Sequence, residues 1–331
     1  MTEVLLSIFF ISVLLLFLST GVWVALSMIG VSSIAMTLFT SRPVGDAMAT
    51  TIWGTSSSWT LTALPLFVWM GEILFRTRLS ENLFEGLSPW MQKLPGGLIH
   101  VNVVGCALFA AISGSSAATV ATVGKMSIPE LRKRNYPEKI LLGSLAGSGT
   151  LGLLIPPSII LIIYGVTVQE SIAKLFVAGI IPGIMIALIF MGYVILWSVF
   201  NKKEMPRMIN QYSFVDKIKK SGQLFPVIIL ILSVIGSIYT GIATATEAAS
   251  LGVVGSLILS YFQKSLNWSN FKSSLLGATK TSCMISFILA GSSFLSLAMG
   301  FTGLPRNLAI WIQNMDLSPY VLIFVLMIFY I

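Results

Sequence analysis

Two short segments of this chain gather hydroxyl side chains and helix-disturbing residues inside stretches that are otherwise apolar. The residues are Ser113, Gly114, Ser115 and Ser116 in the first segment and Gly147, Thr150, Pro156 and Pro157 in the second. Glycine and proline interrupt regular helix and release backbone carbonyls and amides from helical hydrogen bonds. Carbonyl and hydroxyl oxygens are the ligands that a hard cation such as Na⁺ requires. The two segments therefore predict a cation site built from neutral oxygens.

The chemistry of these segments favours Na⁺ over a proton as the bound ion. Within them we expect Ser113, Ser116, Gly147 and Pro156 to supply the Na⁺ ligands. Neither segment contains Asp, Glu or His, whereas a proton-coupled site would need such a group. A half-helix that begins near Ser116 would also direct the positive end of its dipole at an anionic solute. The alternative is helix packing through small residues, as in the Gly143-x-x-x-Gly147 pattern.

Acidic residues within apolar stretches form a second group of candidates. Glu247 lies in an apolar run that predicts a membrane span, and a carboxylate deep in a span is a functional candidate by default. Its counterpart in the repeat described below falls near Ser27, so we favour a hydrogen-bonded structural role for Glu247 over ion coupling. Glu72 and Arg76 are four residues apart and predict an ion pair at the membrane interface.

The composition places these segments in a membrane. The 331 residues are 56% hydrophobic and 10% charged, with a mean hydropathy of +0.92. Soluble domains carry about 25% charged residues. Runs with the length and apolarity of membrane-spanning helices or half-helices recur at 4–20, 21–39, 51–75, 140–166, 172–200, 224–239, 242–262, 281–299 and 320–331. We therefore expect an all-α, polytopic membrane protein.

The basic residues predict the orientation of the chain in the bilayer. The net charge is +8, and eleven of the twenty Lys and Arg residues fall in the connecting segments 125–139 and 201–220. This bias is typical of cytoplasmic loops and argues against a nucleic-acid partner. With both loops in the cytoplasm, the N-terminus is periplasmic, and only Arg42, Lys174 and Arg306 lie outside. Residues 96–124 must then enter and leave on the cytoplasmic side, which predicts a re-entrant helical hairpin.

The sequence also repeats itself with the opposite predicted orientation. Thr20-Gly21 and Thr240-Gly241 each precede an apolar run, and the run at 90–94 aligns with that at 311–315. Such inverted repeats place ion and solute sites where the two copies meet. In this alignment Ile331 corresponds to a position just before the first hairpin tip. We therefore expect an incomplete second repeat and a chain that is truncated at its C-terminus.

These patterns predict five successive segments. They are helices of the first repeat at 1–95, a hairpin and broken helix at 96–171, a span and basic loop at 172–220, helices of the second repeat at 221–318, and the start of a second hairpin at 319–331.

Four motifs in this order resemble one protein family. They are AAISGSSAATVATVG at 110–124, AGSGTLGLLIPPS at 146–158, AGIIPG at 178–183 and GIATATEAA at 241–249. The chain resembles the large membrane subunit (M, or DctM-like) of tripartite ATP-independent periplasmic (TRAP) transporters along its whole length. The second hairpin and second broken helix of that family have no counterpart here.

The resemblance implies an elevator-type transporter that imports organic-acid anions with Na⁺ as coupling ion and no other cofactor. In such a transporter residues 1–95 and 221–318 would form scaffold or arm helices, and the hairpin and broken helix at 96–171 would belong to the transport domain. C4-dicarboxylates, sialic acid and related carboxylates all remain open as solutes. The expected partners are a small Q (DctQ-like) membrane subunit, a periplasmic solute-binding protein and the lipid of a bacterial inner membrane. A stand-alone Na⁺-coupled dicarboxylate or citrate carrier of the same fold is the alternative. No HExxH or GxSxG motif is present, so we predict no enzymatic activity.

Overall fold

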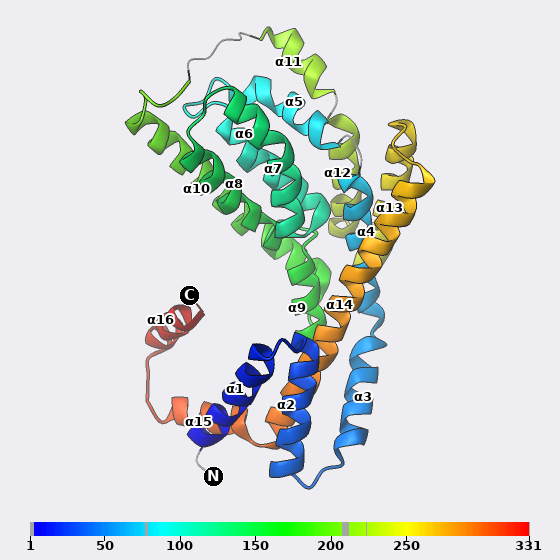
Figure 1. Ribbon diagram of the computed structural model, residues 1–331, viewed down its shortest axis with the longest axis vertical. Helices are drawn as coiled ribbons and strands as arrows, with labels where there is room; N and C mark the ends of the chain where they lie inside the picture. Colours follow the sequence, from blue (N-terminus) through cyan, green and yellow to red (C-terminus); the bar gives the residue numbers. More distant parts are fainter. Residues whose placement is uncertain (1–2, 77–78, 207–211, 223, 331) are drawn as a thin grey trace. The chain divides into compact units, whose positions relative to one another are not determined.

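The computed structural model describes residues 3–76, 79–206, 212–222 and 224–330, and this part of the chain is helical (Figure 1). The first helices are α1 (Glu3–Ser19), α2 (Val24–Phe39), α3 (Val44–Ser56), the 3₁₀ helix η1 (Trp59–Thr62), α4 (Ala63–Phe75), α5 (Leu79–Met91), α6 (Ile99–Ser113) and α7 (Ser116–Lys133). They are followed by α8 (Glu138–Gly149), the 3₁₀ helix η2 (Thr150–Leu153), α9 (Ile159–Val168), α10 (Ile172–Phe200), α11 (Phe214–Ser221), α12 (Phe225–Tyr239), α13 (Ala245–Phe262), α14 (Trp268–Phe301), α15 (Leu304–Gln313) and α16 (Pro319–Tyr330).

The prediction of an all-α, multi-pass membrane protein is confirmed. Within the described residues α10, α13 and α14 are each long and apolar enough to cross a membrane, and several apolar helices of 10–17 residues accompany them. Large apolar side chains on α10 are highly exposed, with Ile181 at 78% and Phe200 at 83%. A long row of such side chains would be costly in water but is favourable against lipid.

The helices form two compact units. The first contains Met1–Ser57 and Met284–Ile331, and the second contains Ser58–Cys283. The predicted division at residues 95, 171, 220 and 318 stays a prediction.

In the first unit α1, α2 and the end of α14 pack around buried apolar side chains, including Phe10, Val31 and Ala35. Helix α14 lies so close to α2 that a Cβ atom at Gly291 would be 2.8 Å from the carbonyl oxygen of Ala25. Small residues allow this close backbone approach.

In the second unit α6, α7 and α8 pack against one another (Figure 1), and α4 packs against α13. Buried Val103, Ala110 and Leu151 join α6 to η2, and Phe190 of α10 packs against them. This cluster includes Leu151 of the second segment that the sequence singled out and Ala110, which lies one turn before the first.

The repeated Thr-Gly pairs have the same local geometry. Gly21 and Gly241 have φ angles of +80° and +73°, which glycine adopts without the strain of a side chain. The amide of Val22 donates to the carbonyl of Phe17 at 3.2 Å, and the amide of Ile242 donates to that of Ser237 at 3.0 Å. The sequence repeat therefore reproduces a helix-terminating turn.

The structure differs from the sequence expectation at residues 51–75. The predicted apolar run divides into α3, η1 and α4, because α3 ends at Ser56 within the cluster Thr55-Ser56-Ser57-Ser58. Serine and threonine side chains compete with helical backbone hydrogen bonds. In the second copy α14 continues without interruption for 34 residues.

We predict that Gly291→Ala lowers the unfolding temperature of the purified protein, because the added Cβ meets the backbone of α2. Gly300→Ala is the matched control, since it lies in the same helix with nothing within 4 Å of the added atom. There the better helix propensity of alanine should leave stability unchanged or raise it by up to about 1 kcal/mol. Thermal unfolding in detergent measures both, and equal shifts would contradict the proposed α2–α14 contact.

Candidate ion and substrate site

The first segment forms the tip of a helical hairpin. Helix α6 ends at Ser113, and Gly114 adopts φ +58° while its amide donates to the carbonyl of Ala110 at 3.0 Å. Glycine is favoured at this helix-ending position because the left-handed conformation strains other residues. Ser115 is extended and caps α7, since its hydroxyl accepts a hydrogen bond from the amide of Ala118 at 3.4 Å. The predicted helical hairpin and its tip are therefore confirmed.

Hydroxyl groups hold the tip together from within. The Ser113 and Thr119 hydroxyl oxygens are 2.9 Å apart, and Ser113 also donates to the carbonyl of Ser115 at 3.3 Å. Ser113 is 7% exposed. The hydroxyl of Ser116 is buried and makes no hydrogen bond to a described residue, which leaves an oxygen available to a ligand. Sequence analysis missed Thr119, although its position in the first turns of α7 could have indicated a partner for Ser113.

The second segment forms the predicted break. Helix α8 ends at Gly149, η2 covers Thr150–Leu153, and regular helix resumes at Ile159 after the Pro156-Pro157 pair. Thr150 donates its hydroxyl to the carbonyl of Gly147 at 2.7 Å. Ser158 donates to the carbonyl of Leu153 at 2.6 Å. Side chains thus replace part of the helical bonding that the prolines and the turn interrupt.

The hairpin tip lies directly against this break. The amide of Ile159 donates to the carbonyl oxygen of Gly114 at 3.2 Å. A Cβ atom at Gly114 would be 2.7 Å from the carbonyl oxygen of Pro157, and one at Gly152 would be 2.9 Å from the amide nitrogen of Ser116. Three of the residues predicted from the sequence, Gly114, Ser116 and Pro157, therefore lie at the contact between the tip and the break.

Other predicted residues face different surroundings. A Cβ atom at Gly147 would be 3.3 Å from the Phe190 ring, so Gly147 faces α10. Thr150 is exposed, and Pro156 lies next to Gly179 of α10. No group of three or more His, Cys, Asp or Glu side chains able to hold a metal ion occurs among the described residues.

The position predicted for Glu247 is wrong. It lies in the first turn of α13, exposed, rather than deep within a span. Its carboxylate accepts hydrogen bonds at 2.8 Å from both the amide and the hydroxyl of Thr244, and its own amide donates to that hydroxyl. This reciprocal arrangement is a capping box, which satisfies the free amides at a helix start.

A cavity of about 310 Å³ adjoins the hairpin tip. Its polar lining residues are Glu72 from α4, Ser113 and Ser115 from the tip, and Thr281 from α14. Gly71 brings α4 against the tip, since a Cβ atom there would be 3.0 Å from the Cα atom of Ser113. The contribution of α4 and α14 was not predicted from the sequence.

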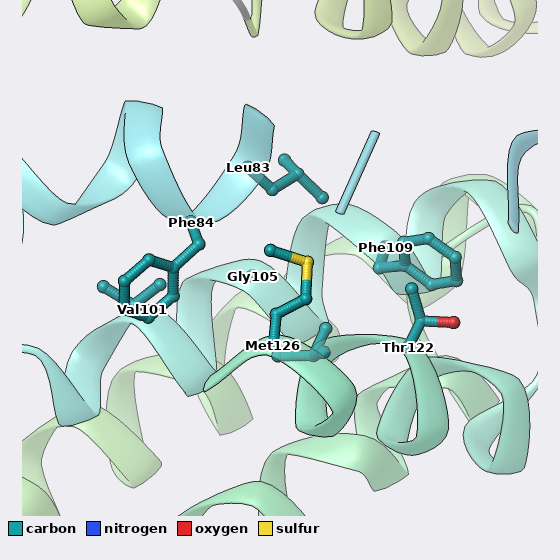
Figure 2. Close-up of a pocket in the computed structure, with 8 residues that line it drawn as sticks. Leu83, Phe84, Val101, Gly105, Phe109, Thr122 and Met126 are labelled. Atoms are coloured by element: carbon teal, nitrogen blue, oxygen red, sulfur yellow. The ribbon is translucent and has the colours of Figure 1, made fainter. Parts of the chain in front are cut away.

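A second cavity, between α5, α6 and α7, has a volume of about 10 Å³ (Figure 2). This volume holds about one water molecule at most. Leu83, Phe84, Phe109 and Met126 line it, and Thr122 contributes the one hydroxyl. The cavity is too small and too apolar for a solute. The space beside the hairpin tip is the candidate substrate site because Ser113 and Ser115 of the first predicted segment line it.

A hairpin tip packed on a broken helix, within an all-helical multi-pass protein, is an arrangement typical of membrane transporters that bind ions at unwound segments. Residues 11–331 match the family model of the DctM component of the tripartite ATP-independent periplasmic transporters. The chain belongs to this family.

Individual relatives agree with this assignment. The chain is 31% identical over 298 residues to the C4-dicarboxylate TRAP transporter large permease protein DctM of Pseudomonas aeruginosa, covering 90% of this chain and 69% of the relative. It is 32% identical over 298 residues to the isethionate TRAP transporter permease protein DctMQ of Oleidesulfovibrio alaskensis, covering 89% and 46%. It is 31% identical over 288 residues to the 2,3-diketo-L-gulonate TRAP transporter large permease protein YiaN of Escherichia coli, covering 85% and 66%. The relatives are transport permeases, and this chain is a component of such a transporter.

We predict that Gly152→Ala separates the hairpin tip from the break, because the added Cβ would lie 2.9–3.1 Å from the backbone of Ser115 and Ser116. Amide hydrogen exchange at residues 114–118 should then become faster, since local opening exposes these amides. Gly143→Ala, which adds a Cβ with nothing within 4 Å on α8, is the control and should leave this exchange unchanged. Unchanged exchange in Gly152→Ala would show that the tip does not depend on this contact.

Proposed function

We propose that this chain carries the ion and solute site of a Na⁺-coupled, ATP-independent importer of organic-acid anions. The observation that supports this most strongly is the contact between the hairpin tip and the broken helix, where oxygens gather without an acidic side chain. Na⁺ is satisfied by carbonyl and hydroxyl oxygens, so such a site needs no fixed negative charge.

In this proposal Ser113, Ser116, Gly147 and Pro156 supply the Na⁺ ligands. The free hydroxyl of Ser116 beside Gly152 supports the part played by the tip. Gly147 and Pro156 would contribute through backbone carbonyls, as unwound helices do in other secondary transporters.

The anion would bind beside the tip, in the cavity of about 310 Å³. The first turn of α7 contributes Ala117 and Ala118 to the cavity wall, and the start of a helix carries a partial positive charge. The relatives are named for C4-dicarboxylates, isethionate and 2,3-diketo-L-gulonate. These solutes share a negative charge, which supports an anion rather than one particular carboxylate.

The match to this family also supports a transporter of three components. Its description is tripartite, and we propose a small Q (DctQ-like) membrane subunit and a periplasmic solute-binding protein as partners in a bacterial inner membrane. The hairpin and broken helix would move together as the carrying part of an elevator, with the basic loops 125–139 and 201–220 in the cytoplasm and the N-terminus in the periplasm. The stand-alone carrier has no specific observation in its favour, because the relatives are named as TRAP permeases.

Uptake by the complete transporter should depend steeply on Na⁺ and be independent of ATP. Proteoliposomes that contain all three components would be given a Na⁺ gradient without nucleotide, and accumulation of a radiolabelled carboxylate would be measured. Equal uptake from Na⁺-free buffer under a proton gradient would contradict Na⁺ coupling.

Ser116→Ala should raise the Na⁺ concentration for half-maximal uptake about tenfold, which corresponds to the loss of about 1.4 kcal/mol of ion binding. Ser233→Ala on α12 is the matched control, since the Ser233 hydroxyl donates only within its own helix, to the carbonyl of Leu230 at 2.8 Å. The Na⁺ dependence of uptake compares the two variants. Identical Na⁺ curves for Ser116→Ala and wild type would remove Ser116 from the ligand set.

A further inference from the structure

The cavity beside the hairpin tip contains a charged group that a simple anion site does not require. Glu72 projects from α4 into its wall, and its side chain is 28% exposed. Its volume of about 310 Å³ lies at the lower end of the range for small-molecule sites, about 300–1,000 Å³. Glu72 and the tip residues Ser113 and Ser115 line the same space.

The two polar parts of the cavity wall, the hairpin tip and Glu72, contact different helices. Gly71 lies against Ser113 of the tip, since a Cβ atom there would be 3.0 Å from the Ser113 Cα atom. The carboxylate of the next residue, Glu72, lies against α14, where a Cβ atom at Gly277 would be 2.7 Å from Oε2. Thr281 follows Gly277 by one helical turn and also lines the cavity. Helix α4 thus contacts the tip through Gly71, whereas the Glu72 carboxylate contacts α14.

Arg76 compensates the charge of Glu72 without entering the cavity wall. Its Nη1 atom forms the ion pair with Glu72 Oε2, as the spacing of four residues predicted. Its Nε donates to the Ser273 hydroxyl at 3.0 Å, and its Nη2 donates to the Ser273 carbonyl at 3.2 Å. Oε1 of Glu72 makes no hydrogen bond to a described residue. Glu72 therefore lines the cavity as an acceptor with a free oxygen, while its carboxylate and its guanidinium partner are both held against α14.

A fixed carboxylate selects between chemical groups on a solute. It accepts hydrogen bonds from hydroxyl and ammonium groups, and charge-assisted hydrogen bonds are the stronger kind. A carboxylate only accepts hydrogen bonds, so it offers no donor to a second carboxylate placed beside it. The α7 helix start and the hydroxyls of Ser113 and Ser115 lack such a charge and suit the carboxylate end of the solute.

We propose that Glu72 is a specificity-determining residue and that the cavity takes carboxylates with a hydroxyl or ammonium donor at the other end. The inference rests on the proposed function, because the anionic end of the solute is assigned to the hairpin tip. The donor would bind Oε1 of Glu72, with Arg76 positioning the carboxylate.

The test compares four solutes of the same carbon chain length: butyrate, 4-hydroxybutyrate, 4-aminobutyrate and succinate. The complete membrane complex that contains this chain would be placed in nanodiscs without the binding protein, so that any selectivity belongs to the permease. Thermal stabilisation would be titrated with each solute in NaCl and in choline chloride. The two donor-bearing solutes should act in NaCl at concentrations about tenfold lower than butyrate and succinate, the effect expected of one hydrogen bond to a charged group.

Variants locate the effect. Glu72→Gln should reduce the tenfold preference to about twofold or less, whereas Glu138→Gln should preserve it. Glu138 is a suitable control because it is exposed and pairs with Arg132 outside the cavity. A preference that survives in Glu72→Gln would overturn the proposal. The wild-type comparison stands even where that variant does not fold.

The outcomes separate this inference from the proposed function. Equal potency of all four solutes in NaCl, or a preference for succinate, would overturn the role of Glu72 while leaving Na⁺-coupled anion binding intact. Stabilisation by none of the four in NaCl, or equal stabilisation in choline chloride, would contradict the proposed function and the inference with it.

Discussion

A single backbone hydrogen bond joins the two interrupted segments: the amide of Ile159 donates to the carbonyl of Gly114 at 3.2 Å. Both groups lie where helix has stopped, at the hairpin tip and after the Pro156-Pro157 pair. In hydrocarbon an unpaired backbone group costs several kcal/mol, so irregular backbone persists there only when protein or a watered cavity satisfies it. The break supplies a donor and the tip an acceptor, so each segment satisfies one backbone group of the other.

This mutual dependence explains the distribution of small residues around the site. A Cβ atom added at Gly71, Gly114 or Gly152 would lie 3.0 Å or less from a backbone atom of a neighbouring segment. The backbone of the tip is therefore packed directly against the backbones of α4 and of the break. At these three glycines close packing brings the oxygen-bearing segments together.

The sequence predicted the features that depend on local chemistry. Glycine and serine at 113–116 and prolines at 156–157 disturb helix wherever they occur, so the tip and the break were visible without a structure. The position of Glu247 was predicted wrongly because the bounds of the span were taken from hydropathy alone. The Thr244-x-x-Glu247 pattern is that of a capping box and indicates a helix start. The cavity wall was not predictable in the same way. Thr281 lines it with Ser113 although 168 positions separate them in the chain, and no local pattern encodes that contact.

The charges of the site follow from the same constraint on desolvation. Among the described residues that line the cavity, the one carboxylate is that of Glu72, which is paired with Arg76, and both side chains are only about a quarter exposed. An ion pair at that depth is tolerated when further hydrogen bonds satisfy it, and Ser273 provides two of them. As an ion pair, Glu72 and Arg76 contribute little net charge. Because the Arg76 guanidinium is hydrogen-bonded to Ser273 of α14, the Glu72 carboxylate is held as an acceptor of fixed direction. A wall of this kind discriminates by the hydrogen-bonding group that the solute presents rather than by the size of the cavity, which several small anions would fit.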